Sequence, residues 1–135
     1  MNDPDHTHSN WAHALFYLGL ALLVGHEMDA VTRQEWQLLP LLSLLEGEVA
    51  RVTFIAVHIP LYVLLFWLTG HRSATIRRRS QIGVDVVLVV HGVAHWAMSG
   101  SAGYLFEPPL ETVLVFGGAI VGALHLAVLW RSRGA

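Results

Sequence analysis

Four apolar segments dominate the hydrophobic pattern of the chain. They run from about Trp11 to Ala30, Val49 to Leu68, Ile82 to Met98 and Leu110 to Trp130. Each is close to the ~20 residues that an α-helix needs to cross the hydrocarbon layer of a bilayer. A helix of a soluble bundle would carry a charged outer stripe, but these segments are almost uncharged all round. The pattern therefore predicts an all-α protein, a bundle of four transmembrane helices.

Two polar tails and a leucine-rich connection accompany these segments. Residues 1–10 are mostly polar and are predicted to be a disordered tail, and residues 132–135 a short C-terminal tail. Residues 11–131 are predicted to form a single transmembrane domain. Between the first two helices, Trp36 and six leucines surround Pro40. This composition favours an interfacial or re-entrant segment.

The amino-acid composition excludes cysteine-based sites and argues against a nucleic-acid-binding surface. Only 13% of the 135 residues are charged, about half the charged fraction of an ordinary soluble domain. A chain without cysteine can hold no disulfide, thiolate zinc site or iron–sulfur cluster. A net charge of −2 offers no footprint for nucleic acid. The predicted surroundings are a lipid bilayer, with homo-oligomerisation left open, and the nine histidines are the feature to explain.

The arginines predict the orientation of the helices. The connection between the second and third segments and the C-terminal end together carry Arg72, Arg77, Arg78, Arg79, Arg131 and Arg133. The opposite side carries only Arg33 and Arg51. Because arginine-rich connections stay in the cytoplasm, both termini are predicted to be cytoplasmic.

A histidine and two carboxylates lie at the end of the first apolar segment, in the run His26-Glu27-Met28-Asp29. His26 and Asp29 are three residues apart and project from one helix face. The other segments also carry histidines, namely His58, the pair His91 and His95, and His125. Because an imidazole in hydrocarbon needs a polar partner, we expect these side chains to form a polar centre inside the bundle.

The spacing of the histidines favours a metal site. His91 and His95 are spaced i, i+4, which lets two imidazoles hold one ion. At a rise of 1.5 Å per residue, His26 and His95 lie near the outer ends of their helices. On the same scale, His58 and His91 lie near the bilayer midplane. With Asp29, these four histidines are the predicted ligands. A nitrogen-rich set with one carboxylate suits zinc, iron or copper better than magnesium or calcium.

The sequence leaves the function of such a centre open. One hypothesis is a metalloprotein with redox or hydrolytic activity on a small or lipidic substrate, in which Glu27 and Glu35 move protons. In a second, His58 and His91 are the two axial ligands of a haem. In a third, the tiers of histidines conduct protons or metal ions. In a fourth, the protein is an accessory membrane subunit whose histidines only hold helices together.

The fourth segment carries polar residues on a packing face. That face holds Glu111, Gly118, Gly122 and His125. The two glycines, spaced i, i+4, allow another helix to approach closely. Asp85 on the third segment lies at the depth of His125, so the two are predicted to pair. Such a pair suits helix packing as well as a proton relay.

Several short runs resemble those of a known family. The runs are Phe16-Tyr17-Leu18-Gly19, His26-Glu27-Met28-Asp29-Ala30, residues 33–40, His58-Ile59-Pro60, the pair His91 and His95, and Gly122-Ala123-Leu124-His125. Together they resemble a family of small bacterial four-helix membrane proteins of unknown function with a His-Glu-(Leu/Met)-Asp-Ala motif. The resemblance implies a four-helix fold and a bacterial inner membrane, and it implies no activity.

Overall fold

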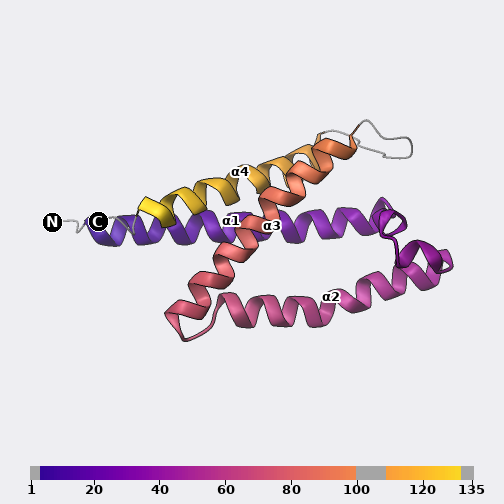
Figure 1. Cartoon of the computed structure of the whole chain (residues 1–135), viewed down its shortest axis with the longest axis horizontal. Helices are drawn as coiled ribbons and strands as arrows, with labels where there is room; N and C mark the ends of the chain where they lie inside the picture. The colour runs from indigo at the N-terminus through magenta and orange to yellow at the C-terminus, as the bar shows by residue number, and fades with distance from the viewer. Residues whose placement is uncertain (1–3, 100–108, 132–135) are drawn as a thin grey trace. The chain divides into compact units, whose positions relative to one another are not determined.

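A computed structural model describes residues 4–99 and 109–131 of the chain (Figure 1). These residues form four helices, α1 (Pro4–Thr32), α2 (Gly47–Thr69), α3 (Ala74–Met98) and α4 (Leu110–Arg131). Two short 3₁₀ helices, η1 (Glu35–Leu38) and η2 (Leu42–Leu44), connect α1 to α2. Each of the four α-helices contains a stretch long and apolar enough to cross a membrane. No strand occurs in the described residues, so the predicted all-α, four-transmembrane-helix class is confirmed.

Helix α1 begins earlier than the hydrophobic pattern predicts. It starts at Pro4, so the part of the predicted disordered tail that the structure describes is helical. Proline suits the first position of a helix because it has no backbone N–H to leave without a partner. Extending an existing helix adds a hydrogen bond for each residue fixed, so an apolar helix can continue into polar sequence. Residues 1–3 and the C-terminal tail at 132–135 lie outside the described residues.

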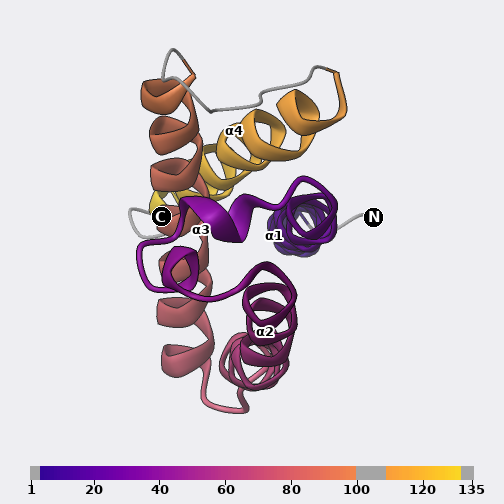
Figure 2. The ribbon, with the colours of Figure 1, turned by 90° about the vertical axis from the view of Figure 1, so that its right-hand side faces the viewer.

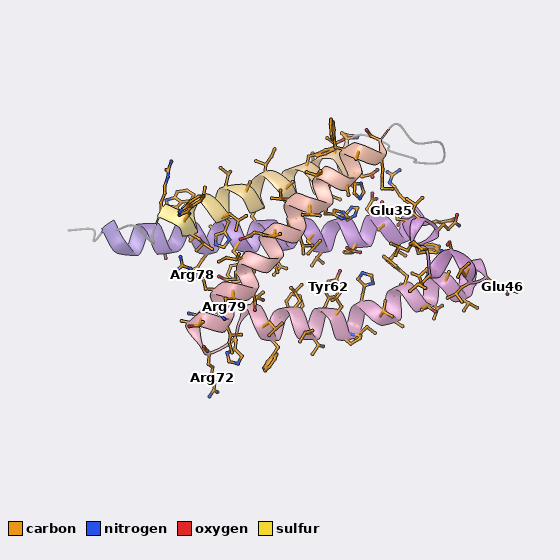
Figure 3. All side chains as sticks on the ribbon, viewed as in Figure 1. Glu35, Glu46, Tyr62, Arg72, Arg78 and Arg79 are labelled. Carbon is orange, nitrogen blue, oxygen red and sulfur yellow. The ribbon has the colours of Figure 1, made fainter. Side chains whose placement is uncertain are left out.

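Helix α3 also begins earlier, at Ala74 rather than near Ile82. The backbone N–H of Arg77 donates to the carbonyl of Ser73 over 3.0 Å, which places Ser73 at the N-cap position. Serine is a preferred residue there, and arginine is a good helix former. Three of the arginines predicted to lie in a connection, residues 77–79, therefore lie on α3. Figure 3 labels Arg72, Arg78 and Arg79 around the start of this helix.

The chain divides into two compact units. The first unit comprises Met1–His26 and Gln81–Ala135, and so contains most of α1, the larger part of α3 and all of α4. The second comprises Glu27–Ser80, with the end of α1, both 3₁₀ helices, α2 and the start of α3. The prediction of a single domain over residues 11–131 stays a prediction.

In the first unit, α3 runs obliquely to α1 and α4 (Figures 1 and 2). Small residues bring the backbones of α3 and α4 close together. A Cβ atom on Gly92 would lie 2.6 Å from the Cβ of Ala119, and one on Gly122 would lie 3.1 Å from the carbonyl oxygen of Asp85. The close helix approach predicted from the glycine spacing is therefore confirmed.

The second unit has its own small core, formed by residues of α1, η1 and α2. Trp36 is 4% exposed and packs with Ala30, Ala50 and Phe54. The connection turns at Gln34, whose φ of 61° lies in the left-handed region. Several of its leucines are exposed, among them Leu41, Leu44 and Leu45. The leucine-rich connection thus contains two short 3₁₀ helices, and its place at a membrane interface stays a prediction.

Candidate metal centre

Three histidines come together in the first unit: His26 from α1, and His91 and His95 from α3. Each offers a ring nitrogen, and these three atoms lie within 4.8 Å of one another. The Nε2 atoms of His26 and His91 are 2.9 Å apart, so one imidazole donates its N–H and the other accepts. The structure thus unites three of the five predicted ligands.

Helix geometry explains how the three rings meet. The i, i+4 spacing places His91 and His95 on one face of α3, with their rings tilted to each other and the ring centroids 4.4 Å apart. The ring of His26 stands edge-on to both, at 4.7 Å from His91 and 5.1 Å from His95. Next to His26, a Cβ on Gly25 would lie 3.0 Å from Leu114 on α4. A larger residue there would require the side chain of Leu114 to shift.

The cluster is largely shielded from its surroundings. His26 is 2% exposed and His95 is 7% exposed, while His91 is partly buried. Burial removes an imidazole from water, so its ring nitrogens need partners within the protein. The three imidazoles each bring one ring nitrogen close to the other two. Such a set of nitrogen donors can bind a single ion.

Glu111, in the first turn of α4, is a fourth polar residue at this cluster. Its Oε1 lies 3.6 Å from Nδ1 of His95, and the residue is 1% exposed. The sequence pattern places Glu111 on a packing face of the fourth segment and not among the predicted ligands. One signal could have found it. Glu111 is the one acidic residue of α4 and lies at its start, and His95 lies near the end of the preceding helix, so both are at the same level.

A second histidine–carboxylate pair lies elsewhere in the first unit. Nδ1 of His125 on α4 donates to Oδ2 of Asp85 on α3 over 2.7 Å. Both residues are 1% exposed, and the ring of Phe16 lies 5.6 Å from that of His125. The pairing predicted from helix depth is confirmed. Because both groups are enclosed, the arrangement fits a fixed contact between helices.

The predicted residues Glu27 and His58 belong to the second unit and contact each other. Oε2 of Glu27 lies 3.1 Å from Nε2 of His58. Nδ1 of His58 donates to the carbonyl oxygen of Phe54 over 2.6 Å, so both ring nitrogens of His58 have partners. The ring of Tyr62, labelled on α2 in Figure 3, lies 5.7 Å from that of His58.

Asp29 and Glu35 also belong to the second unit. Arg33 donates its Nε–H to Oδ2 of Asp29 over 2.9 Å, an i, i+4 ion pair at the end of α1. Glu35 is partly buried in η1. Asp29 and His58 as metal ligands, and Glu27 and Glu35 as proton-transfer groups, therefore stay predictions from the sequence.

The comparisons with known proteins agree with the resemblance at the level of the family. No curated protein and no solved structure matches the chain. The Family of unknown function (DUF6713) matches residues 12–132, a range that includes the three clustered histidines and Glu111. The His-Glu-(Leu/Met)-Asp-Ala motif as a mark of that family, and a bacterial origin, stay predictions. The chain belongs to the Family of unknown function (DUF6713).

Proposed function

We propose that this protein is a membrane metalloprotein whose ion is held by His26, His91 and His95. The observation that carries the proposal is the convergence of three ring nitrogens, within 4.8 Å of one another, from two helices. The structure has four helices long and apolar enough to span a bilayer, and the three histidines lie on two of them, α1 and α3. Placing three histidines in apolar membrane-spanning segments costs free energy unless their ring nitrogens have a polar partner, and one shared ion would be such a partner.

The dimensions of the cluster suit a first-row transition metal. Zinc binds imidazole nitrogen at about 2.0–2.1 Å, so two nitrogens on a tetrahedral ion are about 3.3 Å apart. The 2.9 Å separation between His26 and His91 is close to that value, and small side-chain rotations would supply the rest. Imidazole ligands favour zinc, iron or copper over magnesium and calcium.

A three-histidine set also bears on the class of activity. Structural zinc sites use four protein ligands, whereas catalytic sites with three leave a position for water or substrate. The cluster has three histidine donors among the described residues. This supports redox or hydrolytic chemistry on a small or lipidic substrate over a purely structural ion.

Metal analysis of the purified protein tests the proposal. We expect about one equivalent of zinc, iron or copper in the wild type, and about a tenth of that or less in His26→Ala, His91→Ala and His95→Ala. His13→Ala is the matched control, because His13 is an exposed histidine on α1 outside the cluster. Wild-type protein without metal, or equal loss in His13→Ala, would contradict the proposal. A Soret band in the same preparation would favour the haem alternative.

The proposal includes the orientation predicted from the arginines. Both termini would be cytoplasmic in a bacterial inner membrane, because six arginines lie on that side and two on the other. The count is the same although three of the six arginines, residues 77–79, lie on α3, because they are in its first two turns and so at the same end of the helix. In this orientation, His26 and His95 are near the outer surface.

A further inference from the structure

Glu111 is the most enclosed carboxylate near the histidine cluster. It is 1% exposed and lies in the first turn of an apolar helix. Removing a carboxyl group from water costs several kcal/mol unless a partner compensates, whichever protonation state it adopts. An apolar side chain of similar size would fill the position without this cost. We therefore expect the carboxyl group of Glu111 to have a function besides packing.

Glu111 faces a residue of the proposed metal centre, His95. Its Oε1 lies 3.6 Å from Nδ1 of His95, and the two side chains are 2% and 9% exposed. A neutral imidazole carries its proton on one nitrogen and a lone pair on the other. A carboxylate facing Nδ1 favours the proton on that atom, which leaves the lone pair on Nε2.

We propose that Glu111 is a positioning residue that directs His95 toward the metal ion. It holds the proton of His95 on Nδ1 and fixes the ring, so that Nε2 serves as the ligand atom. This inference rests on the proposed function. It adds α4 to a centre whose ligands come from α1 and α3, so that all three helices of the first unit take part.

The pair Asp85–His125 offers a matched comparison within the same two helices. It also pairs a carboxylate with a histidine, but with the helices exchanged, since the aspartate lies on α3 and the histidine on α4. Its distance of 2.7 Å is shorter, and both residues are 1% exposed. The ring neighbour of His125 in the described residues is Phe16, not another histidine. A carboxylate that only packs helices together should behave like Asp85.

The affinity of the purified protein for Zn²⁺ as the probe tests the inference, measured by competition with a chromophoric chelator. We expect Glu111→Gln to weaken binding by about 10–100-fold, the usual effect of removing a carboxylate behind a ligating histidine. Glu111→Asp keeps the carboxylate and should recover part of the loss. Asp85→Asn should leave the affinity near the wild-type value. The visible spectrum of bound Co²⁺ should change in Glu111→Gln and not in Asp85→Asn.

The outcomes separate this inference from the proposed function. Wild-type protein that binds no Zn²⁺ overturns the metal centre, and the positioning role of Glu111 with it. Tight binding by the wild type with unchanged affinity in Glu111→Gln overturns only the role of Glu111. Equal losses in Glu111→Gln and Asp85→Asn also overturn it, because they would show a general effect of helix packing.

Discussion

The Nε2 atoms of His26 and His91 lie 2.9 Å apart, although 65 positions separate the two residues in the chain. Neither helix alone could produce this contact. It depends on the approach of α1 to α3, and it turns the local i, i+4 pair on α3 into a set of three nitrogens. The i, i+4 pair is common in helices; the third histidine from another helix makes the cluster informative.

His58→Ala should leave the metal content unchanged. Both ring nitrogens of His58 already have partners, Glu27 at 3.1 Å and the carbonyl of Phe54 at 2.6 Å. Elemental analysis of the variant beside His91→Ala is the measurement. Loss of the ion from both variants would instead favour the wider ligand set predicted from the sequence.

Asp85→Ala should destabilise the protein by about 3–5 kcal/mol, because it leaves His125 buried without its carboxylate partner. Replacing both partners by leucine should recover most of the loss, since no polar group then stays uncompensated. Denaturation in detergent, followed by circular dichroism, measures both. A double variant no more stable than Asp85→Ala would count against this account of the pair.

Gly92→Ala should destabilise the first unit by about 1–3 kcal/mol through overpacking. The new methyl group would lie 2.6 Å from the Cβ of Ala119, too close for both helices to keep their positions. A second change, Ala119→Gly, should restore stability. Gly83→Ala is the control on the same helix, because no atom lies within 4 Å of its added Cβ. Thermal unfolding of the wild type and these three variants tests the prediction, and equal effects at positions 83 and 92 would refute it.

The absence of cysteine makes the predicted orientation simple to test. Ser43→Cys lies in η2 and Ser73→Cys lies just before α3, and both positions are exposed. A membrane-impermeant maleimide added to intact bacterial cells should label position 43 at once. It should label position 73 only after the membrane is opened. The reverse pattern would place the arginine-rich end outside.

Most of the fold could be predicted because bilayer thickness sets the length of an apolar helix. The starts of α1 and α3 could not, because both helices continue into polar sequence, from Pro4 in α1 and from the N-cap residue Ser73 in α3. A count of apolar residues does not register such effects. The boundary errors therefore fall where helices leave the predicted hydrocarbon layer.

The candidate site was predicted in part, for a comparable reason. The i, i+4 spacing predicted that His91 and His95 lie on one helix face. Counting residues along the helices predicted that His26 lies at the same depth as His95. Helix depth does not say which partner a side chain takes. Asp29 shares a helix face with His26 but pairs with Arg33, four residues later in the chain. Glu111 on α4 lies beside His95 on α3.

Helices α3 and α4 each supply a partner for a buried acid of the other. Asp85 on α3 pairs with His125 on α4, and Glu111 on α4 faces His95 on α3, so each helix contributes one acid and one histidine to these two pairs. An aspartate at the centre of a lone helix costs about 2.5–3.5 kcal/mol during insertion into a membrane. The two helices therefore gain from entering the bilayer together as a hairpin. The crossed pairs also fix their register, since a slide of one helix along the other would separate both pairs at once.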